Sequence, residues 1–408
     1  MLRITTSTAV LALAWTVAGC DDGEIGNGPT ETLPVADVEG APIAAEPVQR
    51  ADLELSRAPI GVAAATDGVA VATDGGVILA RRTSDDLVDL PLIEDDGSFA
   101  SPGMVRAIVA RQAGFFALAD AGLLHDYEGA LLHSPLGAFV DGDTLLAADV
   151  LQRADGTEEL WLVTDQRALI AGDDLVEVDV SGLGTIERFL GTGTDVAVGV
   201  ADGTLFELDL ETEALSIVDD AVGASHAARR AENGDVFVAT DTGLYRRAAD
   251  GAWSRFTFAA EGAPPERVTA VEAAFGVTVF STPTSVALLD GDAATTIAEG
   301  GADALAVDAI GDTWAVSEGK LTRLVTGKPA TFANDVAPML ADRCVGCHED
   351  GTAPPIDFAS YDDVVARADT IIKRVTRPTS PMPPPPADPL SPDEYGALLR
   401  WRANNFPE

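Results

Sequence analysis

Alternating apolar and polar positions dominate the middle of the chain. From about Asp52 to Val325, short apolar runs are separated by turns rich in Gly, Asp and Asn, and almost no stretch has helical spacing. Alternation with a period of two between turn-forming residues is typical of β-strands that bury one face. Residues 51–328 are therefore predicted to be mainly β.

One phrase recurs along these residues: an alternating apolar strand, a tight turn that often ends in Gly, and a second apolar strand. Glycine suits such a turn because a β-carbon would clash at positive φ. The turn positions are separated by 46, 46, 35, 40, 42 and 34 residues, which suits one four-stranded unit per copy. The seven copies turn at Gly76, Gly122, Ala168, Gly203, Gly243, Ser285 and Gly319.

This spacing predicts a β-propeller, most simply with seven blades. The phrase resembles, in outline, the two-component-regulator repeats and other propeller repeats of periplasmic proteins. It lacks the WD dipeptide and the kelch signature, so the resemblance is to an architecture. A pair of β-sandwiches or a β-helix with similar turn spacing stays open as an alternative.

Helical spacing replaces this alternation in the last part of the chain, residues 329–408. Val336 and Leu340 share one face of a first predicted helix, and Asn334 or Asp335 is placed to cap its start. This change of period predicts a second domain with a core of its own.

Two further helices are predicted in this domain. Apolar residues at helical spacing mark one from Tyr361 to Val375. The sequence Ser391-Pro392-Asp393-Glu394 is a capping box with proline at the first helical position, and it opens the last helix. The predicted fold class is thus mainly β with a small all-α domain at the C-terminus.

Between the first two helices the chain reads Cys344-Val345-Gly346-Cys347-His348. Two thiols at this spacing can form thioethers with the vinyl groups of a haem, and the next imidazole can bind iron from one face. The same spacing occurs in zinc half-sites and redox dithiols. Zinc needs a second ligand pair, and residues 331–408 contain no other Cys or His. The flanks are helical and proline-rich, unlike the βαβ context of a redox dithiol, so one covalent haem c is the favoured cofactor.

Four segments of this domain resemble the small monohaem cytochrome c-like domains found in planctomycetes and myxobacteria. They read DVAPMLADRCVGCH, DFASYDDVV, MPPP and LSPDEYGALLRWRANNF, and the resemblance covers about 78 residues. It implies a cytochrome c-like fold with covalent attachment of the haem at Cys344 and Cys347. It further implies His348 as the proximal iron ligand and Met382 as the distal one.

The residues themselves also favour Met382. Apart from the two thiols of the motif, the only other sulfur in this domain belongs to Met339, whose place on the apolar face of the first helix suits packing. Prolines on both sides of Met382 stiffen the loop and reduce the entropy lost when the thioether is fixed. A thioether ligand raises the potential and suits electron transfer. An open or water-bound iron, with Met382 only packing nearby, stays as the alternative.

The N-terminus reads as an export signal. A basic residue, Arg3, precedes a short apolar core, and Val17-Ala18-Gly19-Cys20 resembles the lipobox of bacterial lipoproteins. This resemblance implies a signal peptide over residues 1–19 and a lipid on Cys20, which would hold the protein at the cell membrane or outer membrane, facing the periplasm. With both motif thiols on haem, Cys20 has no disulfide partner, which favours lipidation over an ordinary signal with an incidental cysteine.

The segment after this cysteine, residues 20–50, is rich in Gly, Pro, Glu and Asp and has no sustained periodicity. Such a composition cannot bury enough apolar surface to order the chain. These residues are therefore predicted to form a disordered tether.

The chain is strongly acidic. It contains 66 Asp and Glu against 26 Lys and Arg, for a formal net charge of -40, and most of this excess precedes the helical domain. Such a surface repels phosphate backbones, so nucleic acid is not expected as a partner.

The favoured function is single-electron transfer to a redox protein partner that the sequence does not identify, with the propeller as a docking or positioning module. The alternative is a redox enzyme whose propeller passes electrons to the fused haem, and a third reading makes the haem a sensor. The sequence shows no convergent set of titratable or metal-binding residues in the propeller, and His125 and His133 are best placed in a surface loop. An electron-transfer protein is therefore favoured over an enzyme.

Overall fold

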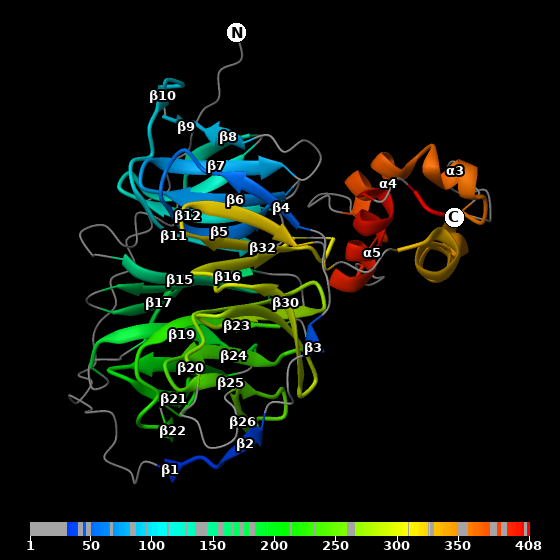
Figure 1. The fold of residues 1–408 in the computed structure, drawn as a ribbon. Coiled ribbons are helices and arrows are strands. Elements are labelled where there is room, and N and C mark those ends of the chain that lie inside the picture. Colours follow the sequence, from blue (N-terminus) through cyan, green and yellow to red (C-terminus); the bar gives the residue numbers. More distant parts are fainter. Residues whose placement is uncertain are drawn as a thin grey trace, which may run out of the picture.

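The fold is mainly β, with a few helices at the C-terminal end (Figure 1). It is known from a computed structural model. The residues that the structure describes are 31–39, 44–45, 50–65, 68–81, 87–94, 96–111, 114–127, 129–134, 145–152, 158–164, 167–171, 175–178, 184–193, 195–212, 214–231, 233–258, 266–308, 310–324, 326, 330–348, 358–375, 382–384, 390–403 and 406–408.

The β-part consists of seven sheets, each built on four antiparallel strands. Blade 1 contains β5 (Pro59–Ala65), β6 (Gly68–Thr73), β7 (Gly76–Arg81) and β8 (Leu87–Leu90). Blade 2 contains β11 (Val105–Arg111), β12 (Gly114–Ala119), β13 (Gly122–Tyr127) and β14 (Ala130–His133), with β9 (Leu92–Ile93) and β10 (Phe99–Ala100) on its outer edge. Blade 3 contains β15 (Leu145–Gln152), β16 (Glu158–Thr164), β17 (Ala168–Ala171) and β18 (Leu175–Val178).

The remaining four blades continue the same order. Blade 4 contains β19 (Ile186–Gly191), β20 (Val196–Ala201), β21 (Thr204–Asp209) and β22 (Leu215–Asp219). Blade 5 contains β23 (Ser225–Arg230), β24 (Val236–Thr240), β25 (Gly243–Arg247) and β26 (Trp253–Thr257). Blade 6 contains β27 (Ala270–Ala274), β28 (Val277–Ser281), β29 (Ser285–Asp290) and β30 (Ala293–Glu299). Blade 7 contains β31 (Ala304–Val307), β32 (Thr313–Ser317), β33 (Lys320–Leu324) and β4 (Arg50–Glu54).

The first strand of each blade lies on the inside of a closed ring. Each of these seven inner strands contacts the next, and β31 of the last blade packs against β5 of the first. A ring of antiparallel sheets around a common axis is a β-propeller. The predicted seven-bladed propeller is therefore confirmed.

Blade 7 is completed by a strand from the other end of the propeller sequence. β4 precedes blade 1 in the chain and pairs antiparallel with β33, with Leu53 opposite Leu321. The outer edge of the last blade is thus covered by the segment that leads into the first. This pairing joins the two ends of the ring through main-chain hydrogen bonds.

Residues 20–50 are predicted to form a disordered tether, but the part of this segment that the structure describes contains short strands. β1 (Glu31–Thr32), β2 (Val35–Glu39) and β3 (Ala44–Ala45) lie parallel to the outer strands of blades 4, 5 and 6. They satisfy three sheet edges that would otherwise present free N–H and C=O groups. Leu33, Val35 and Val38 also pack partly against the cores of these blades.

The seven predicted turns fall at equivalent places. Every one lies in the hairpin between the second and third strands of its blade. Gly203 and Gly319 have φ angles of +78° and +81°, which glycine adopts without a steric penalty. The repeated phrase therefore corresponds to one hairpin in each blade.

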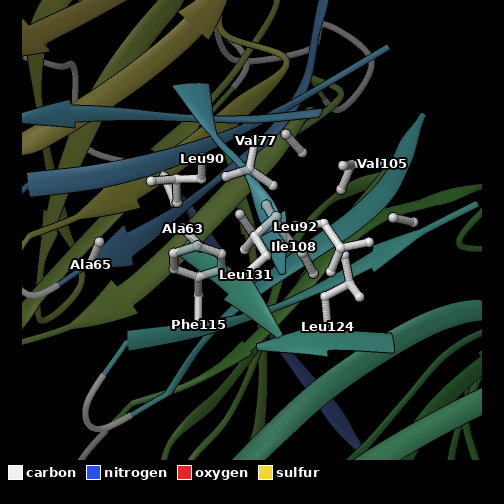
Figure 2. Packing of buried hydrophobic residues seen from close by; sticks show 14 residues of the cluster. Ala63, Ala65, Val77, Leu90, Leu92, Val105, Ile108, Phe115, Leu124 and Leu131 are labelled. Carbon is white, nitrogen blue, oxygen red and sulfur yellow. The ribbon is translucent and has the colours of Figure 1, made fainter. Parts of the chain in front are cut away.

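Neighbouring blades are held together by separate apolar clusters. Figure 2 shows the cluster between blades 1 and 2, where Phe115 and Leu124 of blade 2 face Ala63 and Val77 of blade 1. Similar clusters join each following pair and close the ring between blades 7 and 1. Burial of apolar area in these seven interfaces stabilises the ring.

The C-terminal helical part begins with one continuous helical stretch that combines π-type and α-type turns. It consists of η2 (Phe332–Val336), α1 (Ala337–Leu340), η3 (Ala341–Val345) and α2 (Gly346–His348). The cap is Thr331, whose side chain accepts a hydrogen bond from the N–H of Asn334 at 3.2 Å. Asp335 in turn accepts from the N–H of Thr331 at 2.8 Å. The prediction that Asn334 or Asp335 is the cap is therefore wrong by a few residues, because these two residues already lie in the first turn.

The second predicted helix is interrupted. It forms α3 (Tyr361–Val365) and α4 (Ala368–Val375), separated by a turn at Ala366 and Arg367. The last helix, α5 (Pro392–Ala403), begins with the predicted capping box: the N–H of Ser391 donates to Glu394 at 2.7 Å, and the N–H of Glu394 donates to the Ser391 hydroxyl at 3.2 Å.

One apolar core joins these helices, and it includes Phe332, Val364 and Trp401. The helices lie beside the propeller (Figure 1). They contact it through a small cluster in which Ile310, after β31, and Phe275, after β27, meet Ile372 of α4 and Tyr395 of α5. The helical part therefore packs at the ends of the inner strands of blades 6 and 7.

Candidate functional site

The helix from Phe332 to His348 carries three of the four predicted haem-binding residues. Cys344 lies near the end of η3, and Cys347 follows three positions later in α2. The Cys344 thiol is half-buried against the core of the helical part. The Cys347 side chain lies outside the part of the molecule that the structure describes.

His348 ends this helix and is half-buried. Its ring meets the ring of Phe358 edge-on, with 5.0 Å between centroids and an interplanar angle of 88°. Phe358 belongs to the same core as Cys344. The imidazole therefore contacts the apolar core to which Cys344 also belongs.

Met382 lies in the loop between α4 and α5 and is half-buried. Its N–H donates to the carbonyl of Arg374 at 3.2 Å, which ties the loop to the last turn of α4. Pro383, the next residue, is buried. The predicted distal ligand thus belongs to the same packed unit as the motif helix.

Arg343 precedes the first thiol and connects its helix to α5. Its Nε donates to Oε1 of Glu394 at 2.9 Å, and its Nη2 donates to Oε2 at 3.3 Å. Partial burial acts to raise the pKa of Glu394, but the hydrogen bonds from Arg343 and Ser391 outweigh it and hold this pKa below its ordinary value. The carboxylate is therefore ionised at neutral pH and fixes the start of α5 against the motif helix.

The donor set suits haem c. Two thiols beside an imidazole on one helix, with a thioether in the loop between α4 and α5, are the ligand types of a covalent haem with His and Met ligation. The residues that the structure describes contain no group of three or more His, Cys, Asp or Glu placed to hold a metal ion. Cys20, the predicted lipidation site, and the predicted signal peptide lie outside the described residues. No helix within the described residues is long and apolar enough to span a membrane.

His125 and His133 lie in strands rather than in a surface loop. They belong to β13 and β14, where His125 is opposite Leu132 and His133 is opposite Leu124. Side chains alternate between the two faces of a sheet, so the two imidazoles lie on opposite faces. His133 instead lies 3.3 Å from a carboxylate oxygen of Glu94.

The structure also contains a polar cavity that was not predicted from the sequence. It lies on the propeller axis, has a volume of about 210 Å³ and is lined by all seven inner strands. The sequence suggested no convergent set of titratable residues in the propeller, and this interpretation is wrong. The charged or titratable residues that line the cavity are Arg106, Asp149, Arg188, His226, Arg229 and Asp303.

Arg188 and Arg229 lie on neighbouring inner strands of blades 4 and 5. Nη1 of Arg188 donates to the carbonyl of Glu187 at 2.7 Å, and Nη2 donates to the carbonyl of His226 at 2.8 Å. Burial lowers the pKa of Arg188, and the nearby charge of Arg229 lowers it further. Arg229 itself donates through Nε to Glu272 at 3.0 Å.

Asp149 faces the same cavity from blade 3. Burial raises its pKa from 3.8 to about 6, although the positive charge of Arg229 acts in the opposite direction. The carboxylate therefore changes charge in a weakly acidic range. At the rim of the cavity, Nε2 of His226 lies 2.8 Å from Oδ1 of Asp241, and this contact holds the pKa of Asp241 below its ordinary value.

Comparisons with known proteins bear on the fold alone. No protein-family model matches the chain, and no curated protein matches it. The structure of a streptogramin B lyase aligns over 68% of this chain and 97% of its own, with a TM-score of 0.48 and 13% identity. Virginiamycin B lyase from Staphylococcus aureus aligns over 68% and 99%, with a TM-score of 0.45 and 13% identity. The WD40 β-propeller domain of Doa1 aligns over 68% and 96%, with a TM-score of 0.46 and 11% identity.

At these identities and TM-scores, no activity is carried over from those proteins to this chain. The propeller assignment stands on the order of the strands in each sheet and on the closed ring of inner strands. The chain is thus a seven-bladed β-propeller followed by a packed group of helices.

Proposed function

We propose that this chain is an exported c-type cytochrome, anchored in a membrane through a lipid on Cys20 and facing the periplasm. Its C-terminal helices would form a cytochrome c-like domain over residues 329–408 with one covalent haem. The observation that carries the proposal is the motif helix, which presents Cys344 to an apolar core and ends at a half-buried His348.

Four residues would hold the haem. Cys344 and Cys347 would carry the thioether bonds, His348 would be the proximal ligand of iron and Met382 the distal one. The haem, when bound, supplies one-electron oxidation and reduction.

The helices around these residues fix the ligands before the cofactor binds. Phe358 restricts the ring of His348 from one side, and the hydrogen bond to Arg374 restricts the backbone at Met382. The ion pair between Arg343 and Glu394 keeps the motif helix against α5. Ligands that are fixed in this way lose less entropy when they bind iron.

The propeller would position this domain for a redox protein partner. Its contact with the helices is centred on Ile310, which has only 5% of its surface exposed. The loop that carries Ile310 is fixed by the buried carboxylate of Asp308, which accepts hydrogen bonds from the N–H of Ile310 at 3.0 Å and from the indole of Trp314 at 3.0 Å. A rigid loop at the interface supports a positioning role.

A redox enzyme whose propeller passes electrons to the haem is the second candidate, and the charged axial cavity is the observation in its favour. The cavity and the contact with the helices lie toward opposite ends of the inner strand of blade 6. In blade 6 the cavity is lined by Ala270 and Val271 at the start of β27, whereas Phe275, which contacts the helices, follows the end of that strand. At about 3.3 Å per residue, the two places are separated by roughly 15 Å along the strand.

Spectra of the exported protein test the proposal. A bacterial host that attaches haem to exported cytochromes should yield a protein with the bands of a low-spin c-type haem in the reduced state. Preparations without such bands would refute the cytochrome assignment. Oxidation of small substrates without a protein partner would favour the enzyme, and loss of membrane attachment in Cys20→Ala would support the lipid anchor.

A further inference from the structure

The axis of the propeller is positively charged, in contrast to the rest of this acidic chain. Three arginines line the axial cavity against two carboxylates, although the whole chain has a net charge of -40. Charges that line a narrow cavity with low-dielectric walls act over a longer range than charges on an open surface. The arginines are Arg106, Arg188 and Arg229, and the carboxylates are Asp149 and Asp303.

Arg188 is fixed in the cavity by neutral groups. Both of its hydrogen bonds go to main-chain carbonyls, those of Glu187 and His226, and within the described residues no carboxylate lies in ion-pair contact with it. Carbonyl acceptors orient a guanidinium without neutralising its charge. Of its five N–H groups, those not directed to the carbonyls are free to donate to an acceptor in the cavity.

Arg229 strengthens the field at this place. It lies near enough to Arg188 to lower the pKa of that residue, and two guanidinium groups at such a distance repel each other. Glu272 accepts from Arg229 but makes no ion pair with Arg188. A second anion near both arginines would relieve this repulsion.

The cavity also limits what can enter. The small residues Gly61, Ala107, Ala148 and Ala227 also line the cavity. A volume of about 210 Å³ accepts a molecule of a few heavy atoms and excludes a folded partner or a nucleotide. Arg106 and His226 also line this cavity, but each has a carboxylate partner: Arg106 donates to Asp120 at 3.0 Å, and Nε2 of His226 lies 2.8 Å from Oδ1 of Asp241.

From this arrangement we propose that the axial cavity of the propeller binds one small oxyanion, a carboxylate, sulfate or phosphate group, through the guanidinium groups of Arg188 and Arg229. The proposal does not depend on the haem. Guanidinium groups bind planar and tetrahedral oxyanions with paired N–H donors, which suits both geometries. Asp149, which faces the cavity from blade 3, opposes the anion when it is ionised.

Isothermal titration of the exported full chain tests the proposal with two probes, sulfate and oxalate, in a buffer without other oxyanions. Sulfate represents a tetrahedral dianion and oxalate a planar dicarboxylate, so their relative affinities identify the class of ligand. We expect one saturable site for at least one probe. Absence of saturable binding for both would overturn the proposal.

Three variants locate the site. Arg188→Gln should weaken binding by about tenfold or more, because a charge-assisted hydrogen bond is lost. Asp149→Asn should strengthen binding on the order of tenfold at neutral pH, because a nearby negative charge is removed. Arg57→Gln, which removes an exposed arginine that pairs with Asp89 on the outside of blade 1, should bind as the wild type does.

Arg188 also donates to two main-chain carbonyls, so misfolding would be a second explanation for lost binding in Arg188→Gln. Asp149→Asn tests the site without removing these hydrogen bonds. Melting temperatures establish that each variant is folded. A folded Arg188→Gln protein that binds sulfate and oxalate like the wild type would contradict the assignment. Weaker binding in Asp149→Asn would contradict it independently.

Discussion

The side chains of Arg343 and Glu394 form a two-point ion pair between the motif helix and the last helix. The distances are 2.9 Å from Nε to Oε1 and 3.3 Å from Nη2 to Oε2. Glu394 also closes the capping box of α5 by accepting from the N–H of Ser391 at 2.7 Å. One carboxylate therefore joins the residue before Cys344 to the start of α5.

Glu394→Gln should loosen this connection. The pair is about one quarter exposed, so solvent screening limits its contribution, and we expect a loss of about 1 to 2 kcal/mol. Faster hydrogen exchange of the α5 amides would report it. The control is Asp342→Asn, which removes a carboxylate 3.4 Å from Arg343 that is 75% exposed. Equal effects of the two variants would show that the pair with Glu394 has no special role.

Met382→Ala should remove the thioether from the proposed iron site. The expected result is loss of the methionine-to-iron charge-transfer band and a lower reduction potential, because thioether ligation raises the potential. Visible spectroscopy and a redox titration measure both. Met339→Leu is the matched control, since Met339 is a buried core residue and Leu conserves its volume. A band that persists in Met382→Ala would exclude Met382 as the ligand.

Ile310→Asp should separate the helical part from the propeller. Ile310 is 5% exposed in its cluster with Ile372 and Tyr395, and a carboxylate there would be desolvated. We expect the substitution to destabilise the contact between the helices and the propeller by about 2 to 4 kcal/mol. Small-angle scattering would then show a more extended particle. Val176→Asp, at a side chain that is 51% exposed, should leave the scattering curve unchanged; an unchanged curve for Ile310→Asp as well would contradict the contact.

Asp149 should make the propeller less stable as the pH rises. Its pKa in the folded chain is about 6, above the ordinary value of 3.8, because burial disfavours the charged form. At a pH between these values the folded chain keeps a proton that the unfolded chain has released. The stabilisation that results is complete below pH 3.8 and is lost as the pH rises through 6.

Urea unfolding of the wild type and Asp149→Asn at about pH 4 and about pH 8 isolates this effect. Between about pH 4 and about pH 8, the free energy of unfolding of the wild type should fall by up to about 3 kcal/mol relative to that of the Asn variant. Other carboxylates contribute equally to both proteins, so the difference between them belongs to Asp149. A difference that is the same at both pH values would show that burial of this carboxylate has no cost.

Local features of the fold could be predicted from the sequence. The turns at Gly203 and Gly319 need positive φ, and the capping box at Ser391 and Glu394 joins neighbouring residues, so both are visible in a short window. The alternation around each turn is local as well. Residues that determine a hairpin or a helix start are therefore sufficient to place these elements.

Features that depend on distant partners could not be predicted. β2 is ordered by its parallel pairing with β26, more than two hundred residues later, and its own composition resembles a linker. The pairing of Leu53 with Leu321, which closes the ring, also joins residues that are far apart in the sequence. Arg188 and Asp149 converge only because the ring closes, although their positions just before the repeated hairpins offered a signal once the inner strands had been assigned.

The candidate haem site contains features of both kinds, local ones and ones that depend on distant partners. The motif from Cys344 to His348 is contiguous, so the hypothesis of haem binding could be drawn from it directly. The contacts of its neighbours, Arg343 with Glu394 and His348 with Phe358, require the packed helices. Sequence reasoning therefore proposed the ligands but not the groups that orient them.

The central claim is that Cys344 and Cys347 bind one haem covalently. The most direct measurement is the mass of the exported protein under denaturing conditions, together with its alkaline pyridine spectrum. The account predicts one haem that stays attached to the unfolded wild-type chain and is absent from the Cys344→Ala, Cys347→Ala double variant. A wild-type chain that has the mass of the polypeptide alone, after expression with active haem attachment, would contradict it.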